Sequence, residues 1–212
     1  MNFIRVLLVD DHEVVRAGYR RLLDSTPDVR VVADASTGEQ AISLYSESHP
    51  DVVVMDLTMS GMGGLEASRR ILLRDNKARI LVFSVHENEV FVNRALDQGV
   101  LGYISKRSAS RVLVEAVRKV AAGEMYVGQE LVPYLVKRHR ASDSDLLAEL
   151  SSREFEVFRL LVDSKSVNEI ADLLHLSPKT VGHHMTSIKN KLEISDIAGL
   201  TRLAIRAGII NA

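Results

Sequence analysis

The chain has 212 residues, 46% of them hydrophobic and 26% charged, with a formal net charge of −1; this ordinary globular composition fits one large domain or two small ones and excludes disorder throughout. The absence of cysteine excludes disulfides and thiolate metal sites, and no apolar run approaches the ~18 residues of a membrane span. The short apolar start runs directly into Asp10 and Asp11 without the features of a signal peptide, so we expect a cytoplasmic protein with no membrane partner.

The first half of the sequence alternates between apolar runs typical of strands and segments with helical spacing. The expected strands are 6–9, 29–33, 52–55, 80–83 and 102–104, and the expected helices are 14–23, 38–48, 65–73, 90–96 and 108–121. Continuous runs of Val, Ile and Leu indicate strands buried on both faces, as in a parallel sheet covered by helices. We therefore expect an α/β fold with a doubly wound, five-stranded parallel sheet and a ligand site at the carboxyl ends of the strands.

The alternation ends near Gly123. Residues 130–140 allow a helix, because Pro133 falls in its first turn. The basic run 137–140 is interpreted as a solvated helix end, and the polar residues 141–145 are typical of a linker. We predict a first domain at 1–124, a partly helical linker at 125–147 and a second domain at 148–212.

The second domain is helical in pattern throughout. Ser151 and Glu154 form a capping box before an apolar stripe, and a short helix is expected at 167–174. Ser177 and Pro178 have the residue types of an N-cap and first helical position, and the helix they begin extends to residue 192. Ser195 is expected to open a last helix at 195–207. Four short helices with a tight junction at 175–178 are typical of a helix-turn-helix domain.

Carboxylates stand at the ends of two expected strands: Asp10 and Asp11 after the first, and Asp56 after the third. These ends are adjacent in a doubly wound sheet whose first and third strands are central, and crowded carboxylates repel unless a cation neutralises them. Mg²⁺ suits such oxygen ligands. Ser84 and Lys106 end the next two strands, and the set could stabilise a phosphoryl group on Asp56. A lone Asp at a strand end is usually a turn or cap residue, but the ordered set is more specific.

The segments that carry this set resemble the receiver domain of two-component response regulators over residues 3–122. They are LLVDDH (7–12), VVVMDLTM (52–59), LVFSVHE (81–87) and GYISK (102–106). The resemblance implies a flavodoxin-like fold and makes Asp56 the phosphoacceptor. It further implies that Mg²⁺ binds Asp11 and Asp56 directly, Asp10 through water, and the backbone carbonyl of Thr58.

The same resemblance assigns the remaining receiver residues. Ser84 contacts the phosphoryl oxygens, Lys106 pairs with the phosphoryl group, and Tyr103 rotates inward when Ser84 moves. Two residues depart from the family pattern: Ser60 and Arg107 stand where many members have proline. Ser60 is expected to restrain the loop after Asp56 less than a proline would. Arg107 argues against a cis peptide bond after Lys106, because cis bonds are rare before residues other than proline. Neither removes a chemical group.

The expected helix 178–192 has two different faces. Val181, Met185, Ile188 and Leu192 form one stripe, and the opposite face carries Lys179, His183, Thr186 and Asn190. No acidic residue lies between Asp172 and Glu193, so this face suits a DNA major groove. A solvated face of a small interaction module is the alternative. Gly182 is unusual because a glycine within a helix costs ~1 kcal/mol relative to alanine.

The segments LSSRE (150–154) and NEIADLLHLSPKTVGHHMTSIKNKL (168–192) resemble the LuxR-type helix-turn-helix, which with the receiver marks the NarL/FixJ class. The resemblance places Gly182, His183 and Thr186 against base edges. It assigns contacts with the DNA backbone to Lys179, Thr180, Lys189 and Lys191. It assigns a dimer contact to the last helix. Ser164 departs from the glycine usual at its position and predicts a strained turn.

These features predict a transcription factor controlled by phosphorylation of Asp56. The expected partners are a sensor histidine kinase, double-stranded DNA and a second copy of the chain in the phosphorylated or DNA-bound state. The receiver would assist its own Mg²⁺-dependent phosphorylation without being a turnover enzyme. Phosphorylation would shift an existing equilibrium, by release of the recognition helix or by receiver dimerisation.

Three other interpretations remain open from the sequence. A phosphatase of the haloacid dehalogenase type would have a second aspartate at the position of Thr58 and would leave the C-terminal helices unexplained. A degenerate receiver that takes no phosphate is kept open by Ser60. A second-messenger sensor with the receiver as a dimer scaffold would need a ligand motif, and no Arg-rich motif is present.

Overall fold

The computed structural model describes residues 3–137 and 143–210, and the chain divides into two compact units. The first unit contains the chain up to Glu87 together with Ala95–Val132, and the second contains Asn88–Arg94 together with the chain from Pro133 onward. Among the described residues, no helix is both long and apolar enough to span a membrane.

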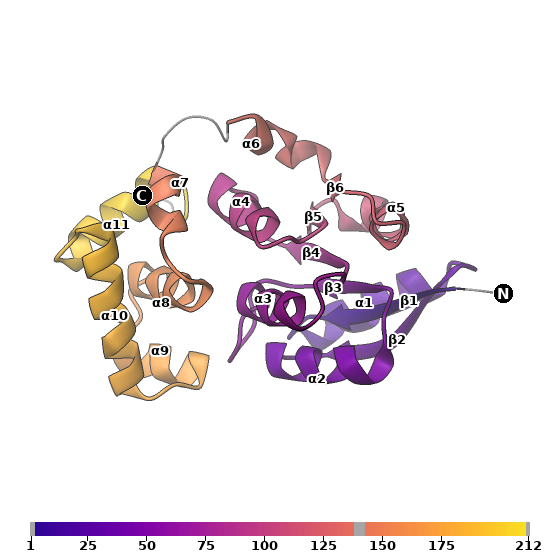
Figure 1. Cartoon of the computed structure of the whole chain (residues 1–212), viewed down its shortest axis with the longest axis horizontal. Coiled ribbons are helices and arrows are strands. Elements are labelled where there is room, and N and C mark those ends of the chain that lie inside the picture. Colours follow the sequence, from indigo (N-terminus) through magenta and orange to yellow (C-terminus); the bar gives the residue numbers. More distant parts are fainter. Residues whose placement is uncertain (1–2, 138–142, 211–212) are drawn as a thin grey trace. The chain divides into compact units, whose positions relative to one another are not determined.

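A parallel sheet forms the centre of the first unit (Figure 1), in the order β2-β1-β3-β4-β5-β6. The strands are β1 Ile4–Val9, β2 Val29–Ala35, β3 Val52–Met55, β4 Ile80–Ser84, β5 Gly102–Ser105 and β6 Tyr126–Val127. The predicted doubly wound sheet is confirmed, with β1 and β3 adjacent at its centre. The predicted number of strands was wrong, because the described sheet has six strands and five were expected.

The additional strand, β6, pairs with the edge of β5. The backbone amide of Tyr126 donates to the carbonyl of Leu101 at 3.0 Å, and that of Gly128 donates to the carbonyl of Tyr103 at 2.9 Å. A Cβ atom at Gly102 would lie 3.0 Å from the carbonyl oxygen of Tyr126, so a residue without a side chain favours the close approach. A two-residue strand is too short to show an alternating sequence pattern. It is defined by its pairing with β5, which the sequence does not reveal.

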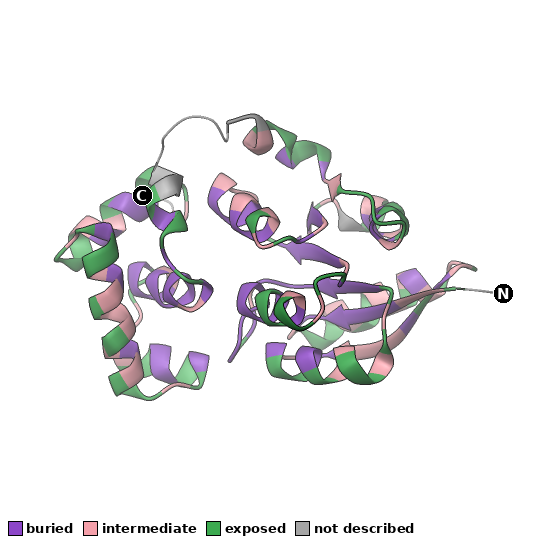
Figure 2. Ribbon diagram, viewed as in Figure 1, coloured by how far each residue is buried: buried purple, intermediate pink, exposed green. Residues whose placement is uncertain are grey.

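Helices cover both faces of the sheet. They are α1 Glu13–Asp24, α2 Gly38–Ser48, α3 Gly64–Arg74, α4 Glu89–Asp97 and α5 Ala109–Ala121. Alternate strand residues such as Leu8, Val54 and Phe83 share one core with Leu113 and Val117 of α5, and α2 packs with α3 over the other face (Figure 1). Figure 2 shows the strands of the sheet as predominantly buried, as expected for a sheet sandwiched between helices.

The segment that follows the sheet is partly helical. Gln129–Leu131 form a 3₁₀ helix and Val132–Lys137 form α6, where one helix was expected at 130–140. Residues 138–140, the rest of that expected helix, and 141–142, the first of the polar residues predicted at 141–145, lie outside the described residues. The helix α7, Asp143–Ala148, occupies the end of the predicted linker.

The second unit contains the helices α8 Ser152–Val162, α9 Val167–Leu174, α10 Pro178–Leu192 and α11 Ile197–Arg206. The predicted capping box of Ser151 and Glu154 is confirmed, as is the N-cap at Ser177, whose hydroxyl accepts from the amide of Thr180 at 3.1 Å. The last helix is instead capped by Asp196, whose carboxylate accepts from the amide of Gly199 at 2.7 Å, so the predicted start at Ser195 was wrong by two residues.

Three turns of this unit place non-glycine residues in the left-handed region, the last of them at Glu193 with φ 55°. Ser164 has φ 61°, as its departure from the usual glycine predicts, and His175 has φ 51°. The second turn joins α9 to α10 in three residues, His175 to Ser177, and the amide of Leu176 closes it by donating to the carbonyl of Ala171 at 2.8 Å. The helix-turn-helix geometry therefore depends on a compact junction between these two helices.

Candidate phosphoacceptor site and nucleic-acid interface

Five of the predicted side chains stand at the carboxyl ends of strands of the sheet. Asp10 and Asp11 follow β1, Asp56 follows β3, Ser84 ends β4 and Lys106 follows β5. The amide of Asp56 donates to the carbonyl of Val9 at 2.9 Å, and the amide of Lys106 donates to the carbonyl of Ser84 at 2.8 Å. Neighbouring strands therefore bring these residues together at one edge of the sheet.

Lys106 bridges two buried carboxylates. Its Nζ donates to Oδ2 of Asp10 at 2.6 Å and to Oδ2 of Asp56 at 2.7 Å. Burial lowers the pKa of the ammonium, but the two carboxylates outweigh this and raise the pKa of Lys106 above its usual value. The lysine therefore stays charged, and it neutralises one of the negative charges collected here.

Asp56 is almost fully buried, with 2% of its side chain exposed. Burial is the main reason that the pKa of Asp56 is raised to about 6, and the charge of Asp10 adds to the rise, whereas Lys106 opposes it. The amide of Thr58 donates to Oδ1 of Asp56 at 3.3 Å. An ionised, desolvated carboxylate of this kind has the character of a nucleophile that an additional cation would stabilise.

Asp11 supplies a carboxylate oxygen without a hydrogen bond. Its Oδ1 is buried and accepts none, although Nδ1 of His12 lies 2.7 Å away. One ligand atom each from Asp10, Asp11, His12 and Asp56 lie within 4.8 Å of one another. Three crowded carboxylates, one of which has a buried oxygen that accepts no hydrogen bond, match the oxygen ligands that a small hard divalent cation prefers. The residues present therefore fit Mg²⁺.

Ser84 and Tyr103 lie beside the carboxylates and are both fully buried. The phenol of Tyr103 donates to the carbonyl of His86 at 2.7 Å, and the amide of His86 donates to the hydroxyl of Ser84 at 3.1 Å. Burial raises the pKa of Tyr103 well above its usual range, so the ring is a neutral donor. The loop after β4 therefore couples the two residues through His86, which also lies 3.0 Å from the hydroxyl of Thr58.

The loop after Asp56 is held by contacts that the sequence did not reveal. A Cβ atom at Gly64 would lie 1.8 Å from the carbonyl oxygen of Asp56, so only glycine permits this approach. Glu39 of α2 accepts from the amide of Met62 at 3.1 Å. Gly64 therefore serves close packing against the backbone of Asp56. The bond between Lys106 and Arg107 is trans, as are the other peptide bonds between described residues.

The outward face of α10 contains most of the residues predicted to contact DNA. Lys179, His183 and Thr186 are exposed, whereas Thr180, Gly182 and Lys189 are half-buried. Open space surrounds the position of a Cβ atom at Gly182. The predicted inner stripe is buried at Val181, Ile188 and Leu192 and half-buried at Met185.

Three of these predicted residues also have side-chain partners within the second unit, and the hydroxyl of Thr180 lies 2.7 Å from that of Ser177. Nζ of Lys191 donates to Oε2 of Glu154 at 2.7 Å and to the carbonyl of Glu149 at 3.2 Å. The hydroxyl of Thr186 donates to the carbonyl of Gly182 at 3.1 Å. Lys191 therefore ties α10 to α8, a role that a count of basic residues does not reveal.

Glu154 is the centre of the polar contacts between α8 and α10. Its carboxylate accepts from the hydroxyl of Ser187 at 2.6 Å and from the amide of Ser151 at 2.7 Å, in addition to Lys191. Although burial raises the pKa of Glu154, these donors lower it to about 2.

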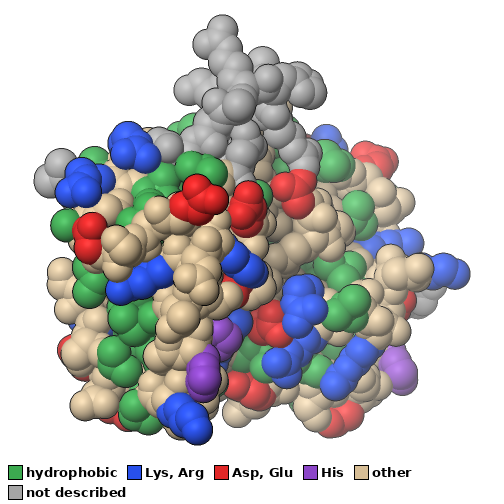
Figure 3. Space-filling model, turned by 60° about the vertical axis from the view of Figure 1, so that its left-hand side comes forward, with side chains coloured by type: hydrophobic (Ala, Val, Ile, Leu, Met, Phe, Trp, Pro, Cys, Tyr) green, Lys and Arg blue, Asp and Glu red, His purple; other side chains and the backbone are tan. Residues whose placement is uncertain are grey.

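The face drawn in Figure 3 intersperses cations with carboxylates, so any attraction for phosphates is local rather than a property of the net charge.

Comparison with protein families places both halves of the chain. Residues 6–118 match the model described as the response regulator receiver domain, and residues 148–204 match the model of bacterial regulatory proteins of the luxR family. Response regulator UvrY of Escherichia coli (strain K12) is 38% identical over 211 residues, which cover 99% of this chain and 97% of that protein. Response regulator GacA of Pseudomonas protegens is 38% identical over 210 residues, covering 99% of each chain.

Solved structures of response regulators align with nearly the whole chain. The RcsB response regulator of Salmonella typhimurium aligns with a TM-score of 0.71 at 26% identity, covering 99% of each chain. A structure of the RcsB–DNA complex aligns with a TM-score of 0.62 at 25% identity and covers 95% of this chain and 98% of that one.

Proposed function

The chain belongs to the response regulators that combine a receiver domain with a luxR-family regulatory domain, and on this premise we propose that a histidine kinase phosphorylates Asp56 to control binding of duplex DNA by α10. The observation that carries the proposal is the bridge from Lys106 to Asp10 and Asp56 at the carboxyl end of the sheet. This arrangement combines a buried nucleophile with a fixed cation.

In the proposed reaction an oxygen of Asp56 attacks phosphorus of the phosphorylated kinase histidine. An oxygen–phosphorus bond forms, the phosphorus–nitrogen bond breaks, and the imidazole leaves. Asp10, Asp11, Asp56 and the carbonyl of Thr58 would hold Mg²⁺, which neutralises negative charge on the phosphoryl oxygens. Lys106 would exchange its contact with one of its two carboxylates for a contact with the phosphoryl group. The same site residues would also support hydrolysis of the acyl phosphate, without making the chain a turnover enzyme.

Ser84 and Tyr103 would transmit the change. A new acceptor on Asp56 would attract the hydroxyl of Ser84, and the ring of Tyr103, which is already fully buried, would shift into the space that Ser84 leaves. Their shared connection through His86 supports a coupled movement of the loop after β4. Phosphorylation would thereby shift a two-state equilibrium through a local electrostatic change.

The second domain would read DNA as a dimer. RcsB, at 25–26% identity, is described in complex with DNA and as two dimers bound to two parallel DNAs. By analogy, Gly182, His183 and Thr186 face base edges, and Lys179, Thr180 and Lys189 contact phosphates, with α11 as the dimer contact. Lys191 was predicted to join the phosphate contacts, but its pairing with Glu154 supports a role in positioning α10 instead. We propose a cytoplasmic regulator with domains at 1–124 and 148–212; the segment 125–147 between them includes β6, which belongs to the sheet of the first unit.

The test is the intact mass of the purified chain after incubation with Mg²⁺ and a small acyl phosphate, beside the variant Asp56→Asn. The parent is expected to gain one phosphoryl group, and the variant and a Mg²⁺-depleted parent none. If the parent gains none from either the acyl phosphate or a phosphorylated histidine kinase, the chain is a degenerate receiver and the proposal fails.

A further inference from the structure

We infer that Arg16 is a positioning residue that sets the direction of the chain through Asp10 and Asp11, and thereby the affinity of the site for Mg²⁺; the inference rests on the proposed function. Arg16 lies on α1, one turn after the carboxylate pair, and 17% of its side chain is exposed. It has no place in the chemistry described above, and no motif in the sequence drew attention to it.

The contact that carries the inference joins Arg16 to the backbone of the site. Its guanidinium donates to the carbonyl oxygen of Asp10 at 2.7 Å. On the other side of the same residue, the amide of Asp10 donates to the carbonyl of Ala35 in β2 at 3.1 Å. The peptide groups on both sides of the Asp10 Cα are thereby fixed, and the second of them leads directly into Asp11.

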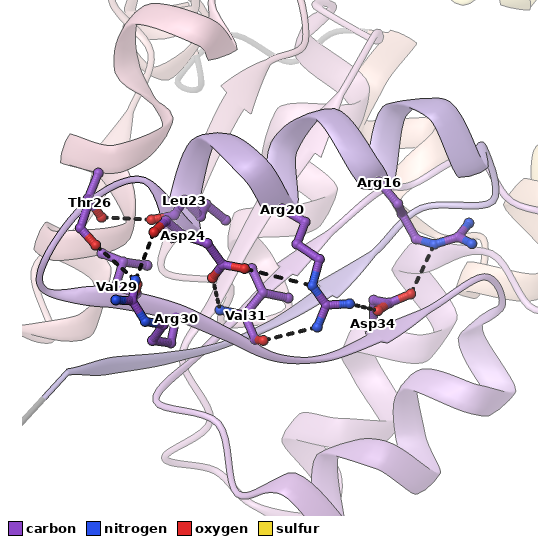
Figure 4. Close-up of polar contacts among 9 residues, drawn as sticks. All are labelled: Arg16, Arg20, Leu23, Asp24, Thr26, Val29, Arg30, Val31 and Asp34. Atoms are coloured by element: carbon purple, nitrogen blue, oxygen red, sulfur yellow. Dashed lines mark hydrogen bonds and ion pairs between the residues drawn. The ribbon is translucent and has the colours of Figure 1, made fainter.

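A row of alternating charges holds Arg16 in place (Figure 4). Its Nε lies 3.4 Å from Oδ2 of Asp34 on β2, and Oδ1 of Asp34 pairs with Arg20. Arg20 in turn donates to the carbonyl of Val31 at 3.1 Å, and its Nε lies 3.8 Å from Asp24. The row runs along α1 and β2 from Asp24 to the backbone of Asp10.

This arrangement favours positioning over a long-range charge effect. Asp34 lies beside the guanidinium and cancels much of its field at the carboxylates. What remains is the hydrogen bond to the carbonyl of Asp10, which a residue without a donor cannot make. The loss of a hydrogen bond that orients a metal-binding residue without touching the metal typically lowers metal affinity by 10- to 100-fold. Because Arg16 acts on one peptide group rather than on a ligand atom, we expect an effect near the lower end.

The experiment titrates the full-length chain with Mg²⁺, following backbone amide chemical shifts, and measures the melting temperature of each variant without metal. Arg16→Met is expected to raise the dissociation constant for Mg²⁺ about tenfold. Asp34→Asn is expected to raise it less, and Arg20→Met least, because each is one step further along the row. Arg16→Lys keeps a donor and is expected to recover part of the loss.

The matched control is Arg30→Met. Arg30 lies on β2 and also donates to backbone carbonyls, those of Asp24, Thr26 and Val29 at 2.8–3.1 Å (Figure 4). It meets the row at the backbone of Asp24, which is the end of the row farthest from Asp10. It is expected to lower the melting temperature and leave Mg²⁺ affinity unchanged.

Two outcomes would overturn the inference while leaving the proposed function intact. The first is a parent that binds Mg²⁺ and accepts phosphate while Arg16→Met binds Mg²⁺ equally well. The second is a loss of affinity that follows the melting temperature across all variants, Arg30→Met included. A parent that binds no Mg²⁺ would instead contradict the proposed function itself.

Discussion

The two candidate sites of this molecule are built in opposite ways. At the carboxyl end of the sheet, Asp10 and Asp56 are buried and both accept hydrogen bonds from the half-buried Lys106, so the fold determines their geometry before any ligand arrives. On α10, Lys179 and His183 project from an exposed helix, so their geometry is completed only by a partner. Substitutions in the first site should therefore change stability and chemistry together, whereas those of exposed side chains such as Lys179 and His183 should change binding alone.

The two lysines that pair with carboxylates show why this distinction matters. Lys106 and Lys191 both donate to a buried carboxylate, but the first pair lies where a phosphoryl group would form and the second ties two helices together. The sequence predicted a functional role for each lysine. The contacts of each ammonium group in the folded chain are what separate a chemical role from a structural one.

The largest effect is expected for Lys106→Met. Removing the ammonium leaves the carboxylates of Asp10 and Asp56 buried without their cation, which should cost about 4 kcal/mol of unfolding free energy at pH 8. Added Mg²⁺ should recover part of the loss, because it would neutralise the same carboxylates. Urea unfolding with and without Mg²⁺ measures both quantities. A loss below about 1 kcal/mol would mean that the pair contributes no more than a surface salt bridge.

A matched pair of glycines tests the contrast directly. Gly64→Ala should destabilise the first unit by about 3 kcal/mol, because its Cβ would collide with the carbonyl of Asp56, and it should slow phosphoryl uptake. Gly182→Ala should stabilise α10 by about 1 kcal/mol, because its Cβ meets open space. Thermal unfolding checks both, and duplex binding by Gly182→Ala decides whether the glycine permits close approach to bases. Equal destabilisation by the two substitutions would contradict the contrast.

Glu154→Gln should cost the second unit about 2 kcal/mol at pH 7, the contribution of hydrogen bonds to a charged group. Burial raises the pKa of Glu154, but its donors lower it to about 2 in the folded state. Its stabilisation is therefore fully present above the ordinary pKa of a glutamate and is lost as the pH falls toward 2. Unfolding of parent and variant between pH 7 and pH 2.5 should show the difference shrinking with acid.

The control for this prediction is Glu169→Gln, which alters the corresponding capping box at the exposed start of α9. Its loss should be much smaller. A difference between parent and Glu154→Gln that stays constant with pH would show that the carboxylate charge is unimportant.

The smallest effect separates two neighbouring lysines. Lys189→Met should lower the salt dependence of duplex binding by about one unit in the log–log slope, as expected for one lost phosphate contact. Lys191→Met should leave that slope unchanged and lower the stability of the second unit, because Lys191 pairs with Glu154. Binding titrations at several salt concentrations distinguish them, and a reversed order of slopes would restore Lys191 to the DNA contacts.

The sequence predicted those parts of the molecule whose signal is local. Apolar runs that end in Asp10, Asp56 and Ser84 reveal strand ends, and capping residues such as Ser151 and Ser177 reveal helix starts. The close packing of Gly64, the short strand β6 and the bond from Arg16 to Asp10 depend on residues distant in the chain or on the path of the backbone. Such features leave no periodic pattern, so they emerge only from the folded arrangement.

The most direct test of the account measures binding of one labelled duplex, selected from a random pool by the phosphorylated chain, before and after treatment with Mg²⁺ and an acyl phosphate. Fluorescence anisotropy should show binding at least tenfold tighter after treatment of the parent, a typical coupling between two sites, and no change for Asp56→Asn. A parent that gains the phosphoryl mass but binds the duplex with unchanged affinity, or an Asp56→Asn variant that responds like the parent, would contradict the account.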